Sequence, residues 1–271
     1  MPDRGAEPQF SWNRPFLCFA EAEGLLKSAC FHFHPCSGPR WSATGFFVSR
    51  EGLALTADHS LRPDPSETLL TAHYGGDRLE LEWVKEWSSE DADIAVLRLC
   101  GGPRDPEIRW LTVGYLDPGA AWQSRCRSWA GRRACVFGFP VRGERLEGCC
   151  LEAAVDASTP LVTLTEATPE GGQAPAERLN LVANRRLSSL EGMSGAPILD
   201  LQLCCIIAVQ GSYDVQAVLG GDGRHYVEGS GRLLGSEIAQ LVDKAPAVAK
   251  RAGFVKLEYG RPKAAAPPTW L

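Results

Sequence analysis

Short apolar segments separated by turn-forming residues fill the chain from about residue 25 to about residue 245. Gly, Pro, Asp and Ser interrupt these segments, and no helical pattern lies between them. Short strands at this spacing are typical of a β-barrel or a β-sandwich, so the sequence predicts an all-β fold. The segments are 43–48, 53–56, 79–84, 94–97, 134–137, 161–164 and 203–209.

A segment rich in Gly, Pro and Arg, residues 101–133, divides the strands into two comparable sets. This division predicts two antiparallel β-barrels of the six-stranded type, joined by a linker. We expect the first barrel over about 25–110 and the second over about 130–235, within a single domain spanning 25–245. The flanking regions are a polar lead-in over 1–24 and a Pro- and Ala-containing tail or linker over 246–271.

One helix is predicted at the C-terminal end of the domain, over 235–245. Ser236 is placed to cap its N-terminus, and Pro246 follows its end. Its apolar face consists of Ile238, Leu241 and Val242.

Composition and charge exclude several classes of partner. The net charge of −5 over 271 residues gives no overall attraction to nucleic acid or to an anionic membrane. No segment approaches the roughly 18 apolar residues of a membrane span, and the N-terminus lacks the apolar core of a signal peptide. We therefore expect a cytoplasmic protein whose ten cysteines are reduced. Two arginine clusters are interpreted as solvated loops: Arg125, Arg127, Arg132 and Arg133, and then Arg185 and Arg186.

A glycine-flanked serine at 192–197 has the pattern of a nucleophile on a tight turn. Gly192 and Gly195 allow backbone conformations that a side chain would forbid, and they leave space for a substrate carbonyl. The N–H groups of Gly192 and Ser194 are candidates for an oxyanion hole. The alternative interpretation is a glycine-rich turn that only closes a hairpin.

A histidine and an aspartate in the first half supply the other groups that such a serine needs. His59 follows a strand–turn–strand pattern, which suits a general base held by rigid backbone. Asp93 directly precedes an apolar strand and can orient the imidazole, with Asp91 as its nearest rival. The chain order His, Asp, Ser is the chymotrypsin-type order.

With these residues the chain resembles the trypsin-like serine peptidases, in particular the bacterial ones related to the catalytic domain of the HtrA/DegP group. The resemblance rests on 44–48, 55–59, 93–97, 138–140 and 192–197, and it spans about residues 25–245. It implies a chymotrypsin-like double β-barrel in which His59 is the base, Asp93 the orienting acid and Ser194 the nucleophile. It also implies a primary specificity pocket formed by Ser188, Gln210, Gly211 and Ser212.

Departures from the family pattern bear on control and specificity. Met193 replaces the acid that precedes the serine in zymogen-activated digestive enzymes, so activation by a freed N-terminus is not expected. No acid stands near Ser188 to favour Lys or Arg in the substrate. We do not expect the residues after 245 to form the PDZ domain typical of the HtrA group.

The function that follows is a serine endopeptidase acting on protein or peptide substrates without a cofactor. We expect an intracellular effector, of the kind used in bacterial defence, that is controlled by loop rearrangement or by a protein partner. The alternative is a catalytically silent trypsin fold that serves as a binding module.

A metal site is the remaining alternative. Cys30, His32, His34 and Cys36 alternate along one segment, and their side chains suit zinc. Alternate residues of one strand rarely converge on one ion, and Phe31 and Phe33 facing the core explain the pattern. No metal is therefore expected.

Overall fold

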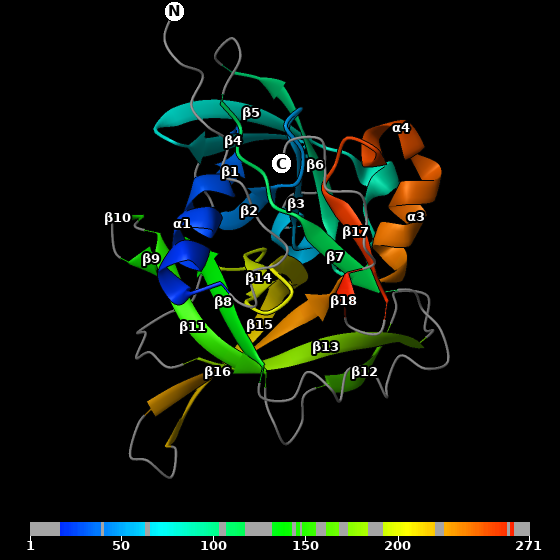
Figure 1. Cartoon of the computed structure of the whole chain (residues 1–271). Helices are drawn as coiled ribbons and strands as arrows, with labels where there is room; N and C mark the ends of the chain where they lie inside the picture. Colours follow the sequence, from blue (N-terminus) through cyan, green and yellow to red (C-terminus); the bar gives the residue numbers. More distant parts are fainter. Residues whose placement is uncertain are drawn as a thin grey trace, which may run out of the picture.

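The structure is a computed structural model that describes residues 17–38, 41–62, 66–102, 107–116, 132–142, 145–146, 148–155, 161–167, 173–183, 192–219, 225–258 and 261–262. Most of the described residues belong to antiparallel strands (Figure 1).

Six strands of the first half form a closed antiparallel barrel in the order β1-β2-β3-β6-β5-β4. Its interior is filled by Phe31, Phe33 and Phe47 together with Leu79 and Leu81, all fully buried. The strands are β1 (Cys30–Pro35), β2 (Ala43–Phe47), β3 (Leu53–Thr56), β4 (Leu69–Tyr74), β5 (Asp77–Trp83) and β6 (Ala95–Gly101).

Six strands of the second half pair in a ring, in the order β8-β11-β13-β16-β15-β14 and back to β8. All pairings in this ring are antiparallel, so the prediction of a chymotrypsin-like double barrel is confirmed. The strands are β8 (Arg133–Gly138), β11 (Cys149–Val155), β13 (Gln173–Ala183), β14 (Pro197–Asp200), β15 (Cys205–Leu219) and β16 (His225–Leu233). Outside the ring lie β9 (Val141–Arg142), β10 (Arg145–Leu146) and β12 (Leu161–Ala167).

Three strands lie where the sequence predicts a linker and a tail. β7 (Val113–Leu116) pairs in parallel with β17 (Phe254–Glu258), which continues to β18 (Arg261–Pro262). β7 also makes one parallel pair with β15, Val113 with Ile206. Val113 and Leu257 are buried, so the burial of these apolar side chains stabilises β7 and β17. The predicted linker therefore contributes one strand and the predicted tail two.

The helices cover the barrels. α1 (Phe19–Ala29) begins inside the predicted lead-in and buries Ala22, Leu26 and Ala29. The Glu21 carboxylate accepts a hydrogen bond from the Cys18 N–H at 3.0 Å and so helps to cap this helix. Short 3₁₀ turns, η1 (Asp58–Leu61) and η2 (Lys85–Trp87), follow strands of the first barrel.

The C-terminal helix is present as predicted. α3 (Ser236–Lys244) buries Ile238 and Leu241, while Val242 is only partly covered. Gly235, rather than Ser236, occupies the capping position. A short helix, α4 (Pro246–Ala249), follows within the predicted tail.

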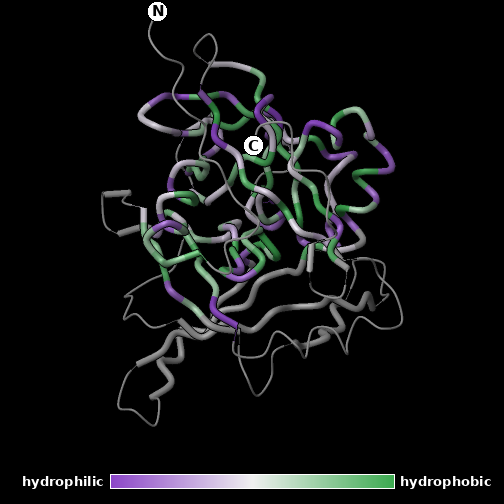
Figure 2. The backbone as a smooth tube through the Cα atoms, in the orientation of Figure 1, coloured by the Kyte–Doolittle hydropathy of each residue, from purple (hydrophilic) through white to green (hydrophobic). Residues whose placement is uncertain are grey.

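One apolar core joins the two barrels. It includes Phe46 and Leu55 from the first barrel, Phe137 and Ile206 from the second, and Leu26 from α1. Figure 2 shows apolar stretches concentrated in the middle of the molecule. This shared core fixes the position of one barrel against the other.

The cysteines of the described residues are free thiols. Five are buried, in agreement with their interpretation as core residues: Cys30, Cys135, Cys149, Cys150 and Cys205. Within the described part of the chain, no helix has both the length and the apolar character needed to cross a membrane.

Candidate active site

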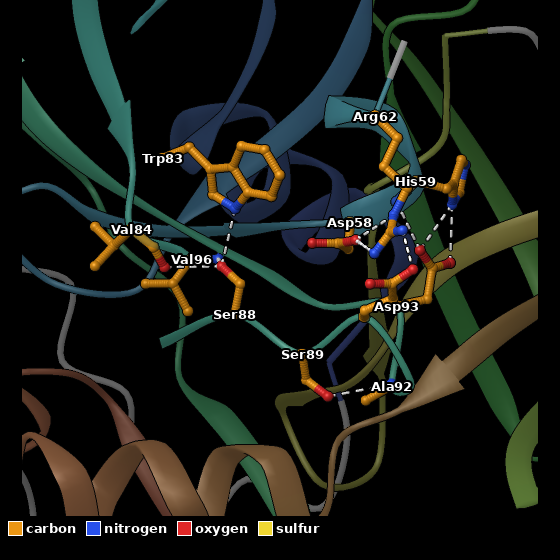
Figure 3. A network of polar contacts seen from close by, with 11 residues as sticks. Asp58, His59, Arg62, Trp83, Val84, Ser88, Ser89, Ala92, Asp93 and Val96 are labelled. Atoms are coloured by element: carbon orange, nitrogen blue, oxygen red, sulfur yellow. Dashed lines mark hydrogen bonds and ion pairs between the residues drawn. The ribbon is translucent and has the colours of Figure 1, made fainter. Parts of the chain in front are cut away.

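His59 and Asp93 are held together at one end of the first barrel (Figure 3). The two carboxylate oxygens of Asp93 lie 2.9 and 2.8 Å from His59 Nδ1, and Asp93 Oδ1 also accepts the backbone N–H of His59 at 2.8 Å. Because a carboxylate oxygen accepts, His59 Nδ1 donates in this contact, and in the neutral imidazole Nε2 is the acceptor nitrogen. The histidine side chain is 45% exposed and the aspartate 14%. An oriented, accessible imidazole of this kind can accept a proton.

The backbone around Asp93 aims its carboxylate at the histidine. Asp93 has φ = 52°, an uncommon left-handed conformation for a residue with a side chain. Its carbonyl accepts the N–H of Asp58 at 3.2 Å, which ties the turn to the segment that carries His59. Asp91 is exposed, and the contact to His59 comes from Asp93.

A second acidic residue, Asp58, stabilises the segment that carries His59. Asp58 is almost fully buried and accepts two hydrogen bonds from Arg62, at 2.7 and 2.6 Å. Arg62 also pairs with Glu90, in the turn that leads to Asp93. Burial raises the pKa of the Asp58 carboxyl, and the hydrogen bonds from Arg62 act against that rise. Sequence reasoning missed this role of Asp58, although the spacing of Asp58 and Arg62 in a short helical turn was a signal.

The serine turn of the second half packs directly against the first barrel. Gly192 and Gly195 have φ values of 90° and 86°, which a residue with a side chain rarely adopts. A Cβ atom on Gly195 would collide with the Thr44 carbonyl and with the Thr56 hydroxyl, and it would lie 3.0 Å from the backbone nitrogen of Ala57. Gly195 therefore lets the turn touch the segment that ends in His59.

Thr44 connects the two halves at this turn. Its backbone N–H donates to the Ser194 carbonyl at 3.0 Å. Its buried hydroxyl donates to the Gly192 carbonyl at 2.8 Å and accepts the N–H of Phe139 at 3.0 Å. A Cβ atom on Gly138 would lie 2.9 Å from that hydroxyl, so the motif at 138–140 leaves room for the contact. The sequence gives no local signal of this role, because its partners lie far away in the chain.

The N–H groups predicted to form the oxyanion hole are available. Within the described residues, neither Gly192 nor Ser194 donates its backbone N–H to another group. Ser194 is half-buried, and its hydroxyl donates to the Gly211 carbonyl at 3.5 Å. In the described part of the chain, no hydrogen bond joins that hydroxyl to His59.

The predicted specificity residues are placed only in part. The Gln210 side chain is buried, and its backbone carbonyl accepts the Gly195 N–H at 2.8 Å. Gly211 borders Ser194. Ser212 lies in β15, and its side chain, like the whole of Ser188, falls outside the described residues.

Two antiparallel barrels with a glycine-flanked serine turn between them define a hydrolase of the chymotrypsin-like fold. A sequence profile of the trypsin-like peptidase domain matches residues 43–209, which is more than half of the chain. The chain therefore belongs to the trypsin-like peptidase family and is a serine peptidase.

Solved structures agree with this fold. The Rv3671c protease of M. tuberculosis in its active form has a TM-score of 0.53 at 17% identity, over 88% of this chain and 87% of that chain. The inactive form of Rv3671c has a TM-score of 0.51 at 17% identity, over 82% and 91% of the two chains. At this identity the likeness shows the fold alone. A search of curated protein sequences finds no match.

Proposed function

We propose that the protein is a serine endopeptidase that cleaves protein or peptide substrates through an acyl-enzyme on Ser194. The observation that carries this proposal is the contact of both Asp93 carboxylate oxygens with His59 Nδ1, at 2.8 and 2.9 Å. The contact makes Nδ1 the donor nitrogen, so that in the neutral imidazole Nε2 presents its lone pair. Such an imidazole is suited to take a proton from a serine hydroxyl.

The proposed reaction has two halves. The Ser194 oxygen attacks the substrate carbonyl while His59 Nε2 accepts the hydroxyl proton, and the N–H groups of Gly192 and Ser194 stabilise the oxyanion. The tetrahedral intermediate then collapses, and His59 gives its proton to the departing amine. Water then attacks the acyl-enzyme carbonyl while His59 accepts a proton from it. The second tetrahedral intermediate collapses, His59 returns the proton to the Ser194 oxygen, and the acid product leaves.

A rearrangement precedes attack in this proposal. The Ser194 hydroxyl lies 3.5 Å from the Gly211 carbonyl, a long contact for two oxygen atoms, whereas attack requires the hydroxyl to donate to His59. The residue before the serine is Met193, which is fully buried and has no carboxylate for a freed N-terminus to pair with. We therefore assign control to loop rearrangement or to a protein partner, in an intracellular effector of the kind used in bacterial defence. Constitutive cleavage of unfolded casein by the purified chain alone would contradict this control.

A fluorophosphonate probe tests the nucleophile. In the presence of an activating protein partner or a substrate peptide, we expect the full chain to be labelled once. Labelling should disappear in Ser194→Ala but persist in Ser28→Ala, whose hydroxyl bonds within α1. His59→Ala should lower kcat on the order of 10⁴-fold or more. If no protein partner or substrate peptide yields labelling that depends on Ser194, the alternative of a catalytically silent binding module replaces the enzyme proposal.

A further inference from the structure

Three of the chain's five histidines gather on the outer face of the first barrel. His32 and His34 alternate with the buried Phe31 and Phe33 along β1. His73 comes from the neighbouring strand β4, directly opposite His32 in the register. The sequence reveals the alternation within β1 but not the histidine that β4 adds to it.

Two of these rings bring the same nitrogen atom, Nε2, close together. The Nε2 atoms of His34 and His73 lie 3.3 Å apart. Two imidazole nitrogens bound to one tetrahedral zinc ion at roughly 2.0–2.1 Å are separated by roughly 3.3–3.4 Å. The observed separation therefore equals the spacing that such an ion requires, and it slightly exceeds that of an ordinary hydrogen bond.

The proton positions also favour a ligand role. His34 Nδ1 lies 2.9 Å from the Pro35 carbonyl, which can only accept, so Nδ1 carries the proton. The Nε2 lone pair of His34 is then free for a metal, and a carbonyl behind the ring is the usual support of a metal-binding histidine. In the ion-free state His73 Nε2–H donates to His34, and metal binding moves the His73 proton to Nδ1.

The third histidine, His32, packs against one member of this pair. The His32 ring stacks on the His73 ring, with centroids 4.6 Å apart and 6° between the planes, and its other neighbour is the Phe139 ring at 5.4 Å. Burial lowers the pKa of His32 to about 4. Arg78 lies opposite His73 in the register of β4 and β5 and donates to Thr71 at 3.2 Å, and its positive charge acts against a bound cation.

We propose that His34 and His73 form a binding site for a divalent transition-metal ion, with zinc as the expected occupant. Within the described residues no group of three or more His, Cys, Asp or Glu side chains could hold a metal ion. Within the part of the chain that the structure describes, the proposed site therefore consists of two imidazole ligands. Imidazole nitrogens favour zinc, copper and nickel over magnesium or calcium.

Zinc binding to the tag-free, chelator-treated full chain tests the site. Isothermal titration with Zn²⁺ should show one site that Mg²⁺ does not fill, and Zn²⁺ should raise the melting temperature. Each of His34→Ala and His73→Ala should weaken binding at least roughly 10-fold, since even outer-shell partners of metal ligands contribute that much. His59→Ala is the matched control, because it removes an exposed imidazole elsewhere and should leave zinc binding unchanged.

The exposed thiols provide the competing explanation. Cys36 and Cys100 are exposed and could hold zinc by themselves. Zinc binding that survives both His34→Ala and His73→Ala, or that is lost in Cys36→Ser alone, would overturn the proposal. An absence of saturable zinc binding in the wild-type chain would also overturn it. Unchanged circular dichroism in metal-free buffer confirms that each variant is folded.

Discussion

A single buried threonine joins the two halves at the candidate active site. The Thr44 hydroxyl pairs with the Gly192 carbonyl and the Phe139 N–H, and so holds the peptide next to a proposed oxyanion donor. Thr44→Val keeps the shape but leaves both backbone groups unpaired, at about 1–3 kcal/mol each. We expect kcat to fall at least roughly 10-fold with little change in KM, and Thr44→Ser to restore it.

Peptide-substrate kinetics on folded variants, with active-site titration by the fluorophosphonate probe, measure this effect. A structural role alone would reduce the fraction of titratable sites and leave kcat per site unchanged. Equal kcat per titrated site in Thr44→Val and the wild type would therefore refute a positioning role.

The lowered pKa of His32 predicts how the stability of the protein depends on pH. His32 has a folded-state pKa of about 4, below its ordinary value, so protons bind preferentially to the unfolded chain between about pH 6.5 and 4. Stability is then present above pH 6.5 and is lost as the pH falls through that window, on the order of 1–3 kcal/mol after allowance for partial exposure. The charged or titratable neighbours are His34, His73 and Arg78.

His32→Phe keeps an aromatic ring between the His73 and Phe139 rings but does not titrate. Urea unfolding in metal-free buffer at pH 7 and pH 4.5 should show a smaller loss of unfolding free energy in the variant than in the wild type. An equal loss in both proteins would mean that other groups control the acid sensitivity.

At the scale of whole elements, local pattern explains which parts of the fold were predictable. The barrel strands carry runs of apolar residues that can be recognised from a few consecutive positions of the sequence. β7 and β17 carry one or two buried residues each, such as Val113 and Leu257, inside segments rich in turn formers. Their parallel pairing joins residues more than 130 positions apart, which no local pattern can show.

The same distinction applies to the candidate site. The His59–Asp93 contact was predictable, because the order of the residues and their positions at strand ends bring them to one end of the barrel. The bond from Ser194 to Gly211 and the contacts of Thr44 depend on how the two barrels dock. The pairing of His34 with His73 depends on the register of β1 against β4. Register and docking are properties of the folded chain rather than of any segment.

For the molecule as a whole, the shared core predicts that the two barrels unfold together. Ile206 of the second barrel belongs to the same buried cluster as Phe46 and Leu55 of the first, and it is fully buried. Ile206→Ala should destabilise the protein by about 2–5 kcal/mol through lost contacts and a cavity. In a cooperative unit this loss lowers amide protection in β2 and β3 as much as in β14 and β15, by roughly 30-fold or more.

Native-state hydrogen exchange, read by mass spectrometry on peptides from each barrel, measures this coupling. The matched control is Leu79→Ala, which removes a buried side chain from the interior of the first barrel rather than from the shared cluster. If the barrels form one unit, both variants lower protection throughout the molecule. Protection in β2 and β3 that stays at the wild-type level in Ile206→Ala would show that the first barrel folds independently. The docking that brings Ser194 against the His59 segment would then be a separate equilibrium from folding.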